Sequence, residues 1–176
     1  MRIQEVQIHD PLGPLRAGEL DLQLTELPID EPDIITGPVI RQELRALIVP
    51  ADHPLAGRDS VSLEDYADSP LVTTAGALPQ YMLDLHYPQR APAGKPIPRG
   101  PAATYWQEVL ALVAAGKGVS PTCLRAGQYY GRPDLAFVPF RDAPPIEYGL
   151  LWPSDQDTPR TRAFVRTISE IASVPG

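Results

Sequence analysis

The three histidines are the side chains of this chain whose type suits acid–base chemistry, and they stand at positions 9, 53 and 86. Asp52 lies next to His53 and could imitate a catalytic dyad, but neighbours in sequence rarely have the geometry that a general base needs. The sequence contains no Gly-x-Ser-x-Gly, no His-Glu-x-x-His and no phosphate-binding glycine loop. We therefore predict that the chain is not an enzyme and has no catalytic residue, no metal site and no cofactor.

Cys123 is the one cysteine of the chain, so an internal disulfide is impossible. This fits a protein of the reducing cytoplasm. A redox-sensing thiol would need neighbours that lower its pKa, and Arg125 is the nearest cation in the sequence. A buried structural thiol is the interpretation that we favour.

Composition limits the classes of partner. The 176 residues suffice for one compact domain or two small lobes, and the net charge of −7 repels nucleic acid and anionic membranes. The arginines are scattered rather than clustered. The sequence has no apolar run of about 18 residues, which predicts that no segment spans a membrane.

Hydrophobic periodicity predicts the elements that must position any functional side chain. Alternating apolar and polar residues predict strands over residues 2–8 and 20–24, with a short helix over residues 10–19 that ends near Gly18. Such a strand–helix–strand unit implies a parallel pair with a right-handed crossover.

The remainder of the chain alternates between short strands and helices. Ser62 fits a helix N-cap, and Asp65 supplies the acid of a capping box. Further strands are predicted over residues 34–40, 44–49, 71–73, 135–140 and 146–152, with a short extended piece near Ile97. Helices are predicted over residues 76–85, 104–115 and 159–172, capped in the last two cases by Thr104 and Thr158.

Three sequence segments together are typical of one protein family. They are LRAGELDL at residues 15–22, the run from Leu44 to Val72 with its His-Pro-Leu step, and VAAGKG at residues 113–118. The chain resembles the effector-binding (substrate-binding) domain of LysR-type transcriptional regulators over essentially its whole length. It departs from the family at residues 119–123, where VSPTC replaces an apolar run that closes on Leu-Pro.

The resemblance implies an α/β, two-lobed periplasmic-binding-protein-like (type II) fold with two crossover strands. Lobe one would comprise residues 1–47 and 151–176, and lobe two residues 48–150. The winged helix-turn-helix, the linker helix and the first strand–helix of lobe one find no counterpart in the sequence. We therefore expect an incomplete lobe one that is either rearranged or stabilised by a partner chain.

In the architecture that the resemblance implies, a ligand binds beyond the C-terminal ends of strands, next to helix N-termini that favour carboxylates. Thr73, Thr74 and Gly76 follow one predicted strand, and Thr104 opens the long helix. These hydroxyls and backbone amides would suit a small organic anion. Alternatively, Thr74 and Thr104 serve only as N-caps, which are worth about 1 kcal/mol each.

Thr25 and Ser120 are further candidate ligand-binding residues. Thr25 follows the second strand of lobe one, although the neighbouring Glu26 would disfavour an anion. Ser120 lies in the segment that departs from the family.

The resemblance implies a function in effector sensing and dimerisation. The expected partners are a small-molecule effector and further copies of the chain, as a homodimer or tetramer built on residues 3–8 and 104–115. DNA would be bound only through a winged helix-turn-helix domain absent from this chain. The alternative is a free-standing solute-binding protein of the same fold, which would require export, and the sequence shows no signal segment.

Overall fold

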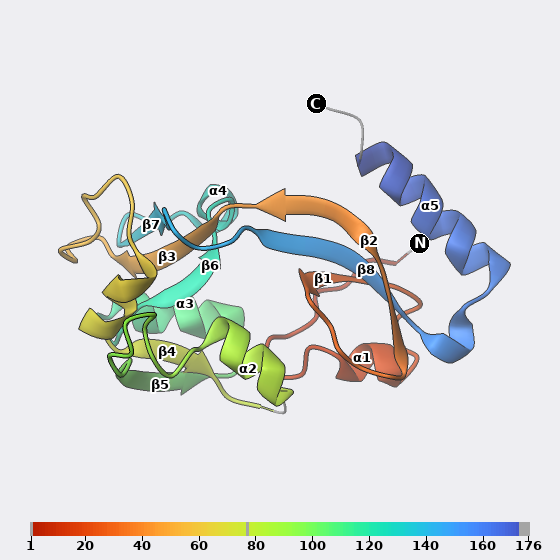
Figure 1. The fold of residues 1–176 in the computed structure, drawn as a ribbon, viewed down its shortest axis with the longest axis horizontal. Helices are drawn as coiled ribbons and strands as arrows, with labels where there is room; N and C mark the ends of the chain where they lie inside the picture. The colour runs from red at the N-terminus through yellow and green to blue at the C-terminus, as the bar shows by residue number, and fades with distance from the viewer. Residues whose placement is uncertain (1, 77, 173–176) are drawn as a thin grey trace. The chain divides into compact units, whose positions relative to one another are not determined.

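Two compact units make up the chain, one formed by residues 1–11 and 44–144 and the other by residues 12–43 and 145–176. They are called unit 1 and unit 2 here. The computed structural model describes residues 2–76 and 78–172 (Figure 1). The two lobes that the family resemblance implies, residues 1–47 with 151–176 and residues 48–150, stay a prediction.

Unit 1 is built around strand β3 (Arg45–Pro50), whose six residues are all buried. In its antiparallel sheet, β3 lies between β6 (Ser120–Cys123) and β7 (Leu135–Pro139), and β4 (Leu71–Thr74) pairs in parallel with β5 (Arg99–Ala103). The helices of unit 1 are η1 (Leu63–Asp68), α2 (Gln80–His86), α3 (Trp106–Ala114) and α4 (Ala126–Tyr130).

Alternation along β3 divides the core of unit 1 into two clusters. Leu47 and Val49 belong to one cluster, whereas Ile48 belongs to a second cluster that includes Val109 and Val113 of α3. Successive side chains of a strand point to opposite faces, so β3 contributes to both clusters at once. Helix α3, which was predicted over residues 104–115, therefore packs against β3, the central strand of this sheet.

Unit 2 contains a second sheet, in which β8 (Ile146–Pro153) lies between β1 (Gln23–Leu27) and β2 (Ile34–Glu43), antiparallel to both (Figure 1). Leu151 packs with Leu12 and Leu15, whereas Leu150 and Trp152 pack with Val165. Two apolar groups thus flank β8. The helices of unit 2 are α1 (Gly13–Arg16), η2 (Ser154–Gln156) and α5 (Pro159–Ala172).

The predicted strand over residues 2–8 is wrong. These residues form no regular element, and Ile3 is 83% exposed. The predicted parallel pair is also wrong, because β1 pairs with β8 and does so antiparallel. Alternation alone does not make a strand, since the segment also needs a neighbour that accepts its backbone hydrogen bonds.

Other local predictions can be compared directly with the structure. The capping box of Ser62 and Asp65 is confirmed, although it opens a 3-10 helix, η1. The helix predicted over residues 10–19 is reduced to α1, and Gly18 follows it with a φ of 69°. Helix α4 was not predicted. Nowhere in residues 2–76 and 78–172 is a helix both long and apolar enough to cross a membrane.

Candidate functional site

The parallel pairing of β4 and β5 brings the two principal candidate loops together within unit 1. In its register, Thr73 lies opposite Ala102 and Thr74 opposite Ala103, so Thr104 follows at the same edge. The Thr74 Oγ1 hydroxyl donates to Ala103 O at 3.3 Å, and Ala75 N donates to the same oxygen at 2.8 Å. Both loops are therefore tied to each other through one carbonyl.

Neither threonine of this site caps a helix. The N-cap of α3 is Tyr105 and that of α2 is Pro79, so the capping interpretation of Thr104 and Thr74 is wrong. Instead, Thr104 N donates to Glu108 Oε2 at 2.7 Å. A carboxylate in the first turn of a helix is stabilised by the helix dipole. The carboxylate of Glu108 thus occupies the N-terminus of α3, where the sequence predicted that a ligand anion would bind.

Gly76 lies against the backbone of His9, which was predicted to belong to lobe one. Its φ is 139°, and a Cβ at this position would lie 2.1 Å from His9 O. His9 Nδ1 is 3.2 Å from Thr104 O, and its ring meets the ring of Tyr105 at 5.4 Å, edge to face. His9 was missed as a site residue because no local pattern signals a contact across 95 residues.

The two remaining candidates are placed differently. Thr25 belongs to unit 2, where it lies opposite Gly149 in the β1–β8 register, and the neighbouring Glu26 accepts a hydrogen bond from Tyr148 Oη. Ser120 lies on β6 opposite Ile48 and is 2% exposed. In this conformation, the Ser120 hydroxyl is not accessible from solvent.

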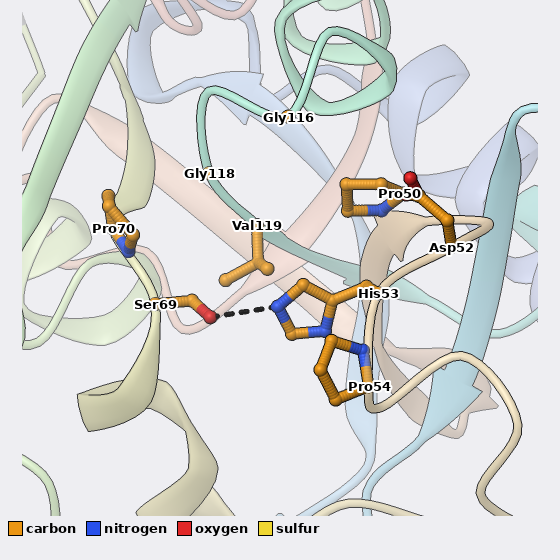
Figure 2. Close-up of a pocket in the computed structure, with 9 residues that line it drawn as sticks. All are labelled: Pro50, Asp52, His53, Pro54, Ser69, Pro70, Gly116, Gly118 and Val119. Atoms are coloured by element: carbon orange, nitrogen blue, oxygen red, sulfur yellow. Dashed lines mark hydrogen bonds between the residues drawn. The ribbon is translucent and has the colours of Figure 1, made fainter.

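Unit 1 also contains a pocket of about 280 Å³ beside His53 (Figure 2). His53 Nε2 lies 3.0 Å from Ser69 Oγ, and Leu55 N donates to His53 Nδ1 at 3.2 Å. Since Nδ1 accepts a hydrogen bond and therefore carries no proton, Nε2 carries the ring proton and donates to the Ser69 hydroxyl. The pocket is lined by Pro50, Asp52, His53, Pro54, Ser69, Pro70, Gly116, Gly118 and Val119.

This geometry excludes the dyad interpretation of Asp52 and His53. Both ring nitrogens are bonded to groups other than the Asp52 carboxylate, and the imidazole donates to Ser69 instead of accepting its proton. Burial lowers the pKa of His53, although the charge of Asp52 acts in the opposite direction. His53 is therefore a neutral structural residue at physiological pH.

The Asp142 carboxylate accepts two hydrogen bonds within unit 1. Burial acts to raise the pKa of Asp142, but hydrogen bonds from Ser62 Oγ and Leu63 N outweigh it and hold the pKa below its ordinary value. Cys123 is half-buried on β6. Among the residues that the structure describes, no group of three His, Cys, Asp or Glu side chains is placed to hold a metal ion.

Comparison with known proteins identifies the fold. The chain is 17% identical to the effector binding domain of QuiR in complex with shikimate, with a TM-score of 0.72, covering 95% of this chain and 78% of that one. It is 22% identical to the BenM effector binding domain with its effector benzoate, with a TM-score of 0.69, covering 96% and 76%. The predicted two-lobed periplasmic-binding-protein-like (type II) α/β fold is confirmed.

Sequence comparison leads to the family. The chain is 32% identical to the HTH-type transcriptional regulator ShiR of Corynebacterium glutamicum (strain R) over 140 residues. That match covers 78% of this chain and 46% of ShiR, so the chain spans about half the length of this relative. The family is one of regulatory rather than enzymatic proteins, as predicted. Because residues 1–173 match the family described as the LysR substrate binding domain, the chain belongs to that family.

Proposed function

We propose that this chain senses a small organic acid as the effector-binding and dimerisation domain of a LysR-type transcriptional regulator. The observation that carries the proposal is the parallel register of β4 and β5, which sets Thr73, Thr74 and Thr104 at one edge. Shikimate and benzoate, named with QuiR and BenM, are both small carboxylates, which supports the same class of ligand here.

The backbone of this edge offers the chemistry that a carboxylate requires. Thr104 N donates to a carboxylate oxygen, that of Glu108, so this amide is already arranged for such a partner. A bound carboxylate would replace Glu108 at this amide and add the Thr74 hydroxyl as a neighbour. Hydrogen bonds to an ionised acceptor are about twice as strong as those between neutral groups.

Regulation follows if the ligand binds one conformation of the domain better than another. A ligand shifts an equilibrium only by its difference in affinity for the two states. In the proposed regulator, this shift changes how copies of the chain assemble as a homodimer or tetramer. The regulator then acts on DNA in the cytoplasm through a winged helix-turn-helix domain. The exposed positions Gln107 and Ala111 of α3 are the surface that we assign to a second copy.

The test is a thermal-shift and calorimetric titration of the 176-residue chain with benzoate, shikimate and the neutral analogue benzamide. A ligand at 100 times its dissociation constant stabilises the folded state by about 2.7 kcal/mol. We expect stabilisation by at least one acid and none by benzamide. Thr74→Ala should reduce the shift, whereas the matched variant Thr122→Ala on β6 should retain it. Equal responses of the two variants would reject the site.

A further inference from the structure

The segment of residues 7–10 lies on the candidate ligand site of unit 1. Residues 2–5 are exposed, whereas Gln7, Ile8 and His9 are half-buried, so burial begins where the segment reaches the site. Ile8 packs against the α3 side of the core, in the cluster that contains Ile48 and Val72. A turn then closes with Asp10 N donating to Gln7 O at 3.2 Å.

Three independent contacts hold His9 at the site. Its Nδ1 lies 3.2 Å from Thr104 O, and its ring is edge to face with that of Tyr105 at 5.4 Å. Its backbone approaches Gly76 so closely that a Cβ there would lie 2.1 Å from His9 O and 2.8 Å from His9 Cα. Only a glycine at position 76 allows this approach.

The polar groups of the site are at the same time bonded within the protein. Thr104 uses its N–H for Glu108 and its carbonyl for His9, and both the Thr74 hydroxyl and Ala75 N donate to Ala103 O. A ligand that enters must therefore break existing hydrogen bonds and move a segment that already covers Gly76.

We infer that residues 7–10 act as an internal plug, which competes with the effector for the loops at Gly76 and Thr104. The inference rests on the proposed function. The plugged state does not bind, so the apparent dissociation constant is raised by the reciprocal of the unplugged fraction. The plug thereby shifts the response of the domain to higher effector concentrations.

Affinity is the first test. His9→Ala removes the ring contacts with Thr104 and Tyr105, and His86→Ala removes a histidine of unit 1 that lies beside Tyr87 instead. One part-buried hydrogen bond corresponds to about a fivefold change in an equilibrium constant. We expect His9→Ala to bind benzoate or shikimate about fivefold more tightly than the unsubstituted chain, and His86→Ala to bind with unchanged affinity.

Histidine NMR signals test the plug without any ligand. The three rings are assigned with the His9→Ala and His86→Ala variants, and a nuclear Overhauser contact between His9 and Tyr105 is expected. Gly76→Ala should abolish this contact. Gly94→Ala should preserve it, because Gly94 also has a positive φ, 88°, but nothing lies within 4 Å of its added Cβ.

The outcomes separate the plug from the proposed function. Loss of the His9–Tyr105 contact on saturation with an acid supports the plug. An unchanged or weaker affinity in His9→Ala overturns it, as does a ligand-free chain without that contact. If no acid binds either the unsubstituted chain or His9→Ala, the proposed function fails, and the plug fails with it even where the contact is present.

Discussion

The hydrogen bonds of His53 decide its chemistry at the scale of the single residue. The Leu55 amide fixes the proton on Nε2, and Nε2 donates to Ser69, which is 6% exposed. Protonation of the ring would place a second proton on Nδ1, where the Leu55 N–H already points. The structure therefore favours the neutral ring, in agreement with the lowered pKa.

This predicts a pH dependence of stability. Burial lowers the folded-state pKa of His53 below its ordinary value of 6.5, so the unfolded chain binds the extra proton first. The contribution to stability is complete above pH 6.5 and is lost as the pH falls toward the folded pKa. Urea unfolding at pH 7.5 and at lower pH should show the loss in the native sequence. His53→Gln, which retains a donor for Ser69, should weaken this dependence, whereas His86→Gln should preserve it.

Gly118 is a second residue whose role follows from one distance. Its φ is 153°, and a Cβ there would lie 2.3 Å from Pro70 O, next to the hydrogen bonds that join Val119 to Pro70 and Val72. We expect Gly118→Ala to destabilise the fold by at least about 2 kcal/mol through steric conflict and backbone strain. Gly57→Ala, with no atom within 4 Å, is the control in the same chemical denaturation measurement. Similar losses in both variants would refute the explanation.

At the scale of elements, the start of η1 is tied to a distant part of unit 1. Ser62 accepts from Glu64 N, Asp65 accepts from Ser62 N, and Asp142 accepts from both Ser62 Oγ and Leu63 N. This explains why a short 3-10 element is stable: its N-terminal donors are bonded both locally and across 80 residues.

Ser62→Ala should therefore lower the free energy of unfolding by more than the loss of an ordinary helix cap does. It removes the cap and one partner of the Asp142 carboxylate, and we expect a loss of about 1 to 2 kcal/mol in the free energy of unfolding. Ser154→Ala, at an exposed position, should change it by less than about 0.5 kcal/mol. Equal effects in urea titrations would show that the contacts of Ser62 do not stabilise the fold.

The comparison of sequence and structure shows which elements could be predicted. The sequence patterns predict β3, β4, β7, β8 and the capping box, because runs of apolar residues and local capping leave a signal within a few residues. The ligand site at Thr73, Thr74 and Thr104 was implied by the family resemblance rather than by these patterns, and it stays a prediction. The position of His9 and the role of Glu108 could not be predicted, since each depends on which distant segment supplies the partner.

At the scale of the whole molecule, each unit has its own sheet and its own apolar clusters. Unit 1 buries the larger core around Leu47 and Ile48, whereas unit 2 depends on smaller groups around Leu151 and Trp152. Local opening costs least where few apolar contacts are buried. Unit 2 is therefore the part that opens more readily.

Hydrogen exchange measured by mass spectrometry should reveal this order. Amides of β3 should exchange more slowly than those of β1. Leu47→Ala and Leu151→Ala each remove a fully buried side chain. We expect each variant to lower the free energy of unfolding by about 2 to 5 kcal/mol. Each variant should accelerate exchange first within its own unit. Uniform acceleration across both units would contradict this division.

The order of strands in unit 2 also has a consequence for synthesis on the ribosome. Both outer strands, β1 and β2, are made early, but the central strand β8 is made only after all of unit 1. Until β8 emerges, the outer strands lack the partner to which their ladder hydrogen bonds are made. The growing chain is therefore expected to complete the core of unit 1 first, while β1 and β2 remain unpaired. The sheet of unit 2 forms only when β8 has been synthesised and pairs with both strands.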